Sequence, residues 1–225
     1  MPDRAMMALM ALALAGGELP SPAAAQPIEP PGSAAPMSQP AVQVANWATA
    51  SGDNRRLAFI VIDKVDAAVF VFGADGQLIG TTPALLGVAV GDHTAPGVGD
   101  RKLSAIRPDE RTTPAGRFLA QFGPAVGHRK VLWVDYAASI ALHPLVTANT
   151  KERRQQRLQS PSAKDNRITY GCINISATFF ENVVRKLLGK TGGVVYILPE
   201  TKPLTDVFPT FRVQQQPGLP AAIGR

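Results

Sequence analysis

The chain has 225 residues, a formal net charge of +6 and a single cysteine. This length favours one main domain, and one cysteine excludes an intramolecular disulfide, so the core must be stable without covalent cross-links. The basic excess suits anionic surfaces, but no nucleic-acid motif, glycine-rich phosphate loop or dinucleotide fingerprint is present. The cysteine and the 3 scattered histidines lack the spacing of a metal site, so we expect no metal and no cofactor.

The first residues, 1–25, are typical of a signal peptide. Arg4 precedes an apolar run ending at Ala15, which is too short to span a bilayer as a helix. The alanines at 23–25 supply the small residues that signal peptidase needs. A disordered, alanine-rich leader is the alternative. We expect an exported protein of the periplasm or cell wall, with no stable membrane insertion after the leader is removed.

Residues 26–54 are rich in proline, alanine, serine and glutamine, which predicts a linker because large apolar residues are too few to offset the entropy of ordering. Residues 55–200 are expected to form the catalytic domain. Residues 201–225 show little periodicity and several prolines, so we expect a partly ordered or frayed C-terminal tail.

Short apolar runs rich in β-branched and aromatic residues predict strands. They lie at 57–63, 68–72, 85–90, 117–122, 131–136, 139–143 and 194–198. Asp75-Gly76 predicts a turn before a further strand at Leu78-Ile79. The long connection at 91–116 is expected to be functional or mobile.

One helix is expected after Ser176, a suitable N-cap, and before Gly189. Its apolar residues recur at helical spacing and predict one buried stripe. They are Phe179, Phe180, Val183, Val184, Leu187 and Leu188. Together the elements predict a mainly β protein with one or two helices, a β-rich α+β fold.

Cys172 lies between a polar loop and the Ser176 helix. A cysteine near a helix N-terminus has a lowered pKa, because the helix dipole stabilises the thiolate. Gly171 has no Cβ and so allows backbone N–H groups to approach a substrate oxygen. These features indicate a reactive thiol, and a buried inert thiol is the alternative.

A reactive cysteine needs a base, and His143 is the best candidate. It ends an apolar strand, where a rigid element can hold the imidazole toward a cleft. A histidine with a purely structural role at a strand end is the alternative. His93 and His128 lie in predicted loops and are expected to be surface residues without a chemical role.

Three ordered motifs resemble the L,D-transpeptidase family with its YkuD-type catalytic domain. The segment Thr169-Tyr170-Gly171-Cys172-Ile173-Asn174 is similar to the family signature Ser/Thr-His-Gly-Cys-x-Asn/Arg, and His143 matches the upstream histidine. The segment from Thr113 to Phe118 resembles Thr-Pro-x-Gly-x-Phe. The resemblance covers about residues 57–199 and implies a β-sandwich or open-barrel fold.

The chain departs from the family pattern at two places. Tyr170 stands where the family usually has histidine, and His143 lies farther before Cys172 than is usual. An inserted flap at 147–167 would explain the longer spacing without moving the His143 strand. Its basic run from Lys151 to Arg157 is either a solvated face or a flap on the substrate side.

The resemblance implies cysteine-dependent acyl transfer on peptidoglycan stem peptides. Cys172 would be the nucleophile and His143 the base, while backbone N–H groups at Gly171 and Cys172, with Tyr170, would hold the oxyanion. The acyl acceptor would be a second stem peptide or an envelope protein. Water as acceptor would make the protein an L,D-carboxypeptidase or endopeptidase, and a non-catalytic wall-binding module is a further alternative.

Three further residues are candidates for the site. Thr169 and Asn174 either brace the turn or contact the stem peptide. Arg117 either pairs with a stem carboxylate or faces solvent, as most arginines on strands do.

Overall fold

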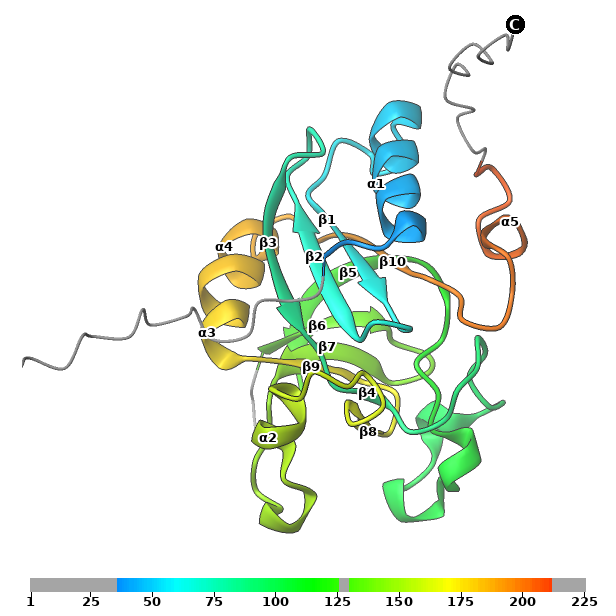
Figure 1. The fold of residues 1–225 in the computed structure, drawn as a ribbon, viewed down its shortest axis with the longest axis vertical. Helices are drawn as coiled ribbons and strands as arrows, with labels where there is room; N and C mark the ends of the chain where they lie inside the picture. Colours follow the sequence, from blue (N-terminus) through cyan, green and yellow to red (C-terminus); the bar gives the residue numbers. More distant parts are fainter. Residues whose placement is uncertain (1–35, 126–129, 212–225) are drawn as a thin grey trace, which may run out of the picture.

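The computed structural model describes residues 36–125 and 130–211 (Figure 1). The expected signal peptide, His128 and the last residues of the expected tail lie outside the described residues. In the described part, strands form the body of the molecule and helices are few, which confirms the predicted β-rich α+β class. No helix within these ranges is long and apolar enough to cross a membrane.

An 8-stranded sheet has the order β3-β2-β1-β10-β5-β6-β7-β9, and β4 pairs with β8 in a separate 2-stranded sheet. The strands are β1 (Phe59–Asp63), β2 (Ala68–Phe72), β3 (Leu78–Pro83), β4 (Leu86–Gly87), β5 (Gly116–Pro124), β6 (Lys130–Asp135), β7 (Ile140–Pro144), β8 (Arg167–Thr169), β9 (Ile173–Ile175) and β10 (Gly193–Ile197). Within the large sheet, β1 with β10 and β7 with β9 are the parallel pairs.

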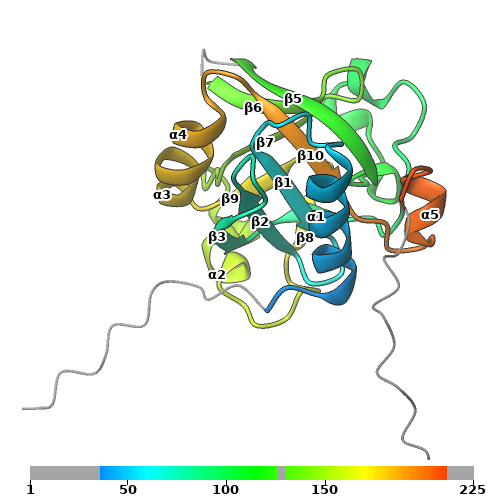
Figure 2. The same ribbon diagram turned by 90° about the horizontal axis from the view of Figure 1, so that it is seen from above.

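Two helical layers cover opposite faces of the sheet (Figures 1 and 2). The central strand β1 is buried on both faces. Its Phe59 and Val61 pack in the cluster that includes α1 (Gln39–Ser51), whereas Ile60 and Ile62 pack in the cluster on the other side. Successive strand residues point to opposite faces, so β1 separates two cores.

The helix expected after Ser176 covers the second core. Ser176 Oγ accepts from Phe179 N at 3.2 Å, which confirms its capping role. The helix runs through α3 (Ala177–Phe179), the π-helical η6 (Phe180–Val184) and α4 (Arg185–Leu188). Phe180, Val184 and Leu188 from the expected stripe are fully buried against the sheet.

The expected linker at 26–54 is corrected by α1. Residues 39–51 form a helix whose Val44, Trp47 and neighbouring alanines are buried on the sheet. Ser38 caps its start, a proline occupies its first turn, and Gly52 ends it in the left-handed conformation. Burial of the Trp47 face supplies the stabilisation that the composition did not indicate.

The expected tail is partly corrected as well. Residues 201–211 pack on α1 through α5 (Leu204–Val207) and through the buried Phe208 and Phe211. Trp47 lies edge-on to Phe211, and its Nε1 donates to Thr210 O at 3.1 Å. The aromatic residues of the tail therefore complete the first core.

Two long connections lie beyond one end of the sheet (Figure 1). The connection at 91–116 contains three 3₁₀ turns, and the segment at 147–167 contains a 3₁₀ turn and one short helix. These elements are η1 (Val98–Asp100), η2 (Leu103–Ala105), η3 (Pro108–Glu110), η5 (Thr150–Glu152) and α2 (Arg154–Leu158).

A fully buried lysine, Lys64, ties the first connection to the sheet. Its Nζ donates to Asp92 Oδ1 at 2.7 Å and to Thr113 O at 3.1 Å, and lies 3.4 Å from Glu200 Oε1. Burial raises the pKa of Asp92, but hydrogen bonds from Lys64 and from residues 200–201 hold it well below its usual value. Lys64 therefore holds both ends of the 91–116 connection, since it contacts Asp92 near the start and Thr113 near the end.

Lys64→Met is expected to lower the free energy of unfolding by about 3–5 kcal/mol, because it leaves the Asp92 carboxylate buried without its cation. Urea unfolding followed by tryptophan fluorescence measures the change. Lys102→Met is the control, since Lys102 is exposed and its removal should change stability by less than about 0.5 kcal/mol. Equal losses in both variants would contradict the buried-charge interpretation.

Candidate active site

Cys172 lies on the turn between β8 and β9, at the edge of the large sheet. Strand β9 separates it from the Ser176 helix, so the expectation that Cys172 sits at a helix N-terminus is wrong. Its thiol donates to Ser139 O at 3.6 Å, just before β7. The sulfur therefore faces the chain that leads into the His143 strand.

The turn is braced by Thr169. Its hydroxyl donates to Cys172 O at 2.7 Å and accepts from Gly171 N at 3.1 Å. Of the two roles considered for Thr169, the contacts support the bracing one. They also occupy the Gly171 N–H, which was one of the two amides expected to hold an oxyanion.

Gly171 is required by its backbone and its surroundings. Its φ of +123° lies in a region that disfavours other residues. A Cβ there would lie 2.7 Å from Ile140 Cδ1 and 2.7 Å from Thr112 O. Thr113 Oγ1 donates to Gly171 O at 2.8 Å and accepts from Gly87 N at 2.9 Å. Thr113, in the Thr-Pro segment, thus contacts both Gly87 and the turn that carries Cys172.

Burial raises the pKa of the Cys172 thiol, although the Ala141 N–H and the positive charge of Arg154 act to lower it. The expectation of a lowered pKa is therefore corrected for the substrate-free protein. Strand β9 lies between Cys172 and the helix whose dipole was expected to stabilise the thiolate. A base is needed to generate the thiolate.

His143 lies on β7, directly opposite Asn174 on β9 in the parallel register. Asn174 is two residues after Cys172, so the register brings the expected base and nucleophile to the same edge of the sheet. The imidazole Nδ1 lies 2.9 Å from Pro144 O, and Nε2 lies 3.0 Å from Asn174 Nδ2. Both ring nitrogens are therefore held in defined positions.

Asn174 is 1% exposed, and its side chain joins His143 to an arginine that was not expected in the site. Arg154 Nη1 donates to Asn174 Oδ1 at 2.8 Å. Arg154 comes from α2, inside the segment expected to be an inserted flap. The basic composition of that segment signalled a charged face, but nothing in it distinguished the one arginine that turns inward.

Tyr170, which stands where the family that the motifs resemble usually has histidine, stacks against Arg111 of the 91–116 connection. The Arg111 guanidinium lies 4.0 Å from the centre of the Tyr170 ring. The same guanidinium donates to Ile106 O at 2.9 Å, which anchors it in the 91–116 connection. This stack joins the 91–116 connection to the turn that carries Cys172.

Arg117, for which a stem carboxylate or solvent was considered, is not brought to Cys172 and pairs with Asp53 instead. Its Nε donates to Asp53 Oδ1 at 2.5 Å, and Tyr196 donates to the same oxygen at 2.6 Å. Arg117 pairs with Tyr196 in the β5–β10 register, and Tyr196 belongs to the core under α1. Arg117 therefore joins the sheet to the α1–β1 turn.

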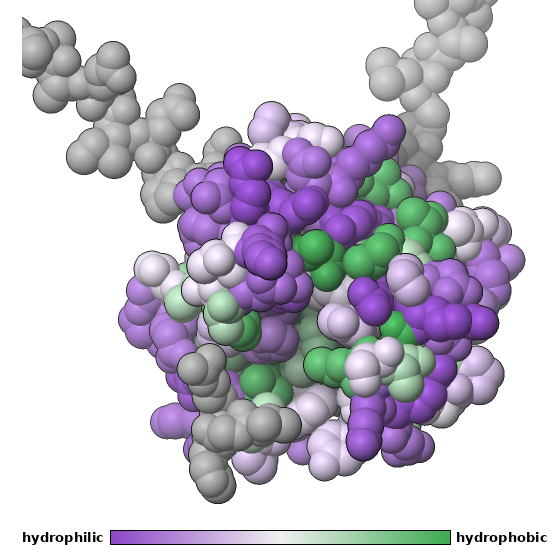
Figure 3. All heavy atoms as spheres, turned by 90° about the horizontal axis from the view of Figure 1, so that it is seen from below, coloured by the Kyte–Doolittle hydropathy of each residue, from purple (hydrophilic) through white to green (hydrophobic). Residues whose placement is uncertain are grey.

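A pocket of about 340 Å³ lies along α2, and another of about 300 Å³ borders His143. The second pocket is lined by Lys130, Val131, His143, Pro144, Val146, Glu181 and Arg185. From below, apolar side chains gather in the middle of the molecular face, inside a hydrophilic rim (Figure 3). The lining of the His143 pocket carries both signs of charge, because Lys130 and Arg185 are basic and Glu181 is acidic.

Some solved structures have a similar fold at low sequence identity. The L,D-transpeptidase from Xylanimonas cellulosilytica is 14% identical, with a TM-score of 0.38 over 63% of this chain and 60% of that one. The catalytic domain of the E. faecium L,D-transpeptidase is 15% identical, with a TM-score of 0.34 over 63% of this chain and 96% of that one. The cell shape determining protein Pgp2 from Campylobacter jejuni is 16% identical, with a TM-score of 0.43 over 65% of this chain and 49% of that one.

No family model matches the chain, and no curated protein matches it either. This chain spans about three fifths of the length of the Xylanimonas structure. The solved structures include L,D-transpeptidases, the family that the sequence motifs resemble. Because the TM-scores are low, the functional proposal rests on the residues of the site itself.

Gly171→Ala is expected to destabilise the protein by more than the matched change Gly97→Ala. Both glycines have positive φ, but a Cβ at Gly97 meets nothing within 4 Å. The control should cost about 1–2 kcal/mol from backbone strain alone, and Gly171→Ala should cost more because it also displaces Ile140 and Thr112. Urea unfolding compares the two, and an equal cost would contradict the close packing around the turn.

Cys172 is the only cysteine, so iodoacetamide reports on this thiol alone. Because burial raises its pKa, the alkylation rate of the folded protein is expected to rise with pH through an inflection above that of the urea-unfolded chain. Mass spectrometry at a series of pH values measures both rates. An inflection below that of the unfolded chain would contradict the assigned pKa direction.

Proposed function

We propose that this protein transfers acyl groups through Cys172 on peptidoglycan stem peptides, as an L,D-transpeptidase-like enzyme. The observation that carries the proposal is the β7–β9 pairing, which places His143 opposite a residue two positions after the only cysteine. A thiol at a braced glycine turn and an imidazole held on the paired strand would supply the nucleophile and the base that cysteine acyl transfer needs.

In the first step, the thiol proton passes to His143 and the Cys172 sulfur attacks the carbonyl of the bond between an L-centre and a D-centre. The thioester forms as that C–N bond breaks, and His143 returns the proton to the leaving D-alanine amine. In the second step, an acceptor amine attacks the thioester and loses its proton to His143. The C–S bond breaks as the new amide bond forms, and His143 returns the proton to the Cys172 sulfur. Dividing the reaction in two lowers each barrier.

His143 Nε2 is the basic nitrogen in this scheme, because Nδ1–H donates to Pro144 O. Asn174 donates to Nε2 in the substrate-free protein, so this hydrogen bond must lengthen as Nε2 receives the thiol proton. The Cys172 N–H is the amide we assign to the oxyanion, since the Gly171 N–H is bonded to Thr169.

The pocket bordering His143 is where we place the acceptor. Glu181 would attract its ammonium group before deprotonation, and Lys130 and Arg185 would pair with a neighbouring carboxylate. An amino group beside a carboxylate is present on the stem peptide side chain, and an exposed lysine of an envelope protein would offer the amine alone. We further propose that the protein is exported and acts in the periplasm or cell wall.

The test is incubation of the purified protein with tetrapeptide-bearing muropeptides, followed by mass spectrometry. Cross-linked dimers and released D-alanine are expected. Cys172→Ala should lower dimer formation at least about a thousandfold, and His143→Ala about a hundredfold or more. His93→Ala is the matched control, since His93 is an exposed histidine of the 91–116 connection and should leave the rate unchanged.

Trimmed monomers without dimers would instead assign an L,D-carboxypeptidase or endopeptidase that uses the same cysteine. Unchanged muropeptides with the wild-type protein would favour a non-catalytic wall-binding module. The resemblance to the transpeptidase family also predicts a covalent carbapenem adduct on Cys172. Absence of that adduct by mass spectrometry would count against a competent nucleophile.

A further inference from the structure

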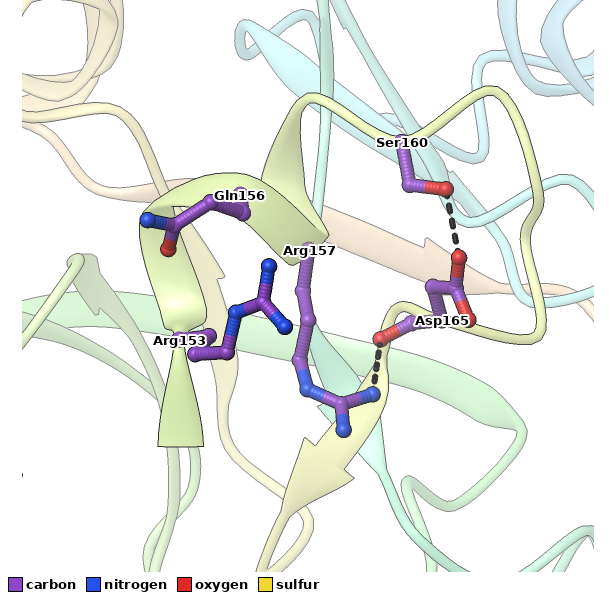
Figure 4. A pocket seen from close by; sticks show the side chains of 5 residues that line it. All are labelled: Arg153, Gln156, Arg157, Ser160 and Asp165. Atoms are coloured by element: carbon purple, nitrogen blue, oxygen red, sulfur yellow. Dashed lines mark hydrogen bonds between the residues drawn. The ribbon is translucent and has the colours of Figure 1, made fainter. Parts of the chain in front are cut away.

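One arginine of the 147–167 segment turns toward the site, while its neighbours turn away. The Arg154 side chain is only 14% exposed, and Glu152 pairs with its Nε. Arg153 and Arg157 instead line the pocket along α2, together with Ser160 and Asp165 (Figure 4). In that view the Arg153 and Arg157 side chains reach into the pocket, and the Arg157 guanidinium donates to Asp165 O.

The contact from Arg154 fixes the orientation of the Asn174 amide. A guanidinium only donates hydrogen bonds, so the oxygen of Asn174 must face Arg154 and its NH₂ must face His143. Without Arg154 the two ends of the amide could exchange places. The buried position of Asn174 allows no other donor for its oxygen among the contacts of the described residues.

The amide orientation in turn fixes the tautomer of His143. The NH₂ of Asn174 only donates, so Nε2 must carry the lone pair. The proton is then on Nδ1, which donates to Pro144 O at 2.9 Å. A run of three hydrogen bonds from Arg154 therefore leaves the nitrogen nearer Asn174 unprotonated, as a base requires.

The charge of Arg154 has a second effect, on the nucleophile. It acts to lower the pKa of Cys172, against burial. The other charged and titratable groups assigned to this region are His143 on β7 and Glu152, which pairs with Arg154 from η5. Glu152 partly offsets the charge but holds the guanidinium in place.

We propose that Arg154 is a positioning residue that sets the tautomer of His143 through Asn174. The proposal deepens the proposed function and rests on it for the reaction that these residues serve. It assigns a role to the 147–167 segment, which supplies a part of the site rather than a solvated face alone.

Arg154→Met tests the proposal, with Arg153→Met as the matched control. Both variants remove one positive charge from adjacent positions, but Arg153 makes no contact with Asn174. At pH 8, iodoacetamide alkylation of Cys172 is expected to slow about threefold to tenfold in Arg154→Met and by less than about twofold in Arg153→Met, since exposed charges are screened. Urea unfolding confirms that the variants compared are folded.

The second measurement is the tautomer of His143, by ¹⁵N NMR of ring-labelled histidine. The signal is assigned by its loss in His143→Ala. The Nδ1–H form is expected to dominate in the unchanged protein, and Arg154→Met should move the ratio at least about threefold toward the Nε2–H form. A merely structural role for Arg154 would leave this ratio unchanged in a folded variant.

Arg154→Lys retains a charged donor and should restore alkylation to within about twofold of the unchanged protein. If Arg154→Met does not fold, Arg154→Gln takes its place with the same expected loss of rate. The proposal is overturned if the folded neutral variant matches Arg153→Met in both measurements, or if Arg154→Lys is as slow as the neutral variant.

Neither measurement needs turnover. If the muropeptide assay yields no product while both measurements respond to Arg154, the proposed function fails and the positioning role stands. If product forms and neither measurement responds, the positioning role fails alone.

Discussion

The buried ammonium group of Lys64 is the constraint on which the rest of the site depends. A cation without access to water must be paired, and here its partners are Asp92 and Thr113 inside the 91–116 connection and Glu200 farther along the chain. One of them, Thr113, also donates through its hydroxyl to Gly171 O. Thr113 thus joins the turn that carries Cys172 to the buried charge of Lys64. This explains physically why a Thr-Pro segment far from Cys172 in sequence belongs to the same motif set.

The candidate site combines a partly buried thiol with an imidazole held on β7. Burial raises the pKa of the Cys172 thiol and so disfavours the thiolate. The imidazole is held between the Pro144 carbonyl and Asn174, so its orientation is fixed before any substrate binds. His143 lies on β7 and Cys172 on the turn that leads into β9, whereas the two connections beside them carry Arg111 and Arg154. Those two arginines contact Tyr170 and Asn174 rather than the reacting atoms.

Most strands and the Ser176 helix could be predicted, because each has an apolar pattern that its own sequence carries. The helix α1 could not, since its small residues only become favourable once Trp47 packs on Tyr196 and Phe211. Strand β9 is too short to show a pattern, and missing it placed Cys172 wrongly at a helix end. The candidate residues Cys172 and His143 were accessible from local motifs. Lys64 and Arg154 were not, because the direction of a charged side chain is decided by partners distant in sequence.

The parallel pair β7–β9 has a consequence for how such a protein can change. The chain leaves the sheet after β7 and must return to begin β9 beside it, and parallel strands require a crossover of a dozen residues or more in any case. The length and sequence of the segment between β7 and β9 can therefore vary while the register of the two strands stays the same. In our proposal, substitution of Arg154 in α2 changes the tautomer of His143 while that register stays the same. Reactivity and architecture are, in this fold, separately adjustable.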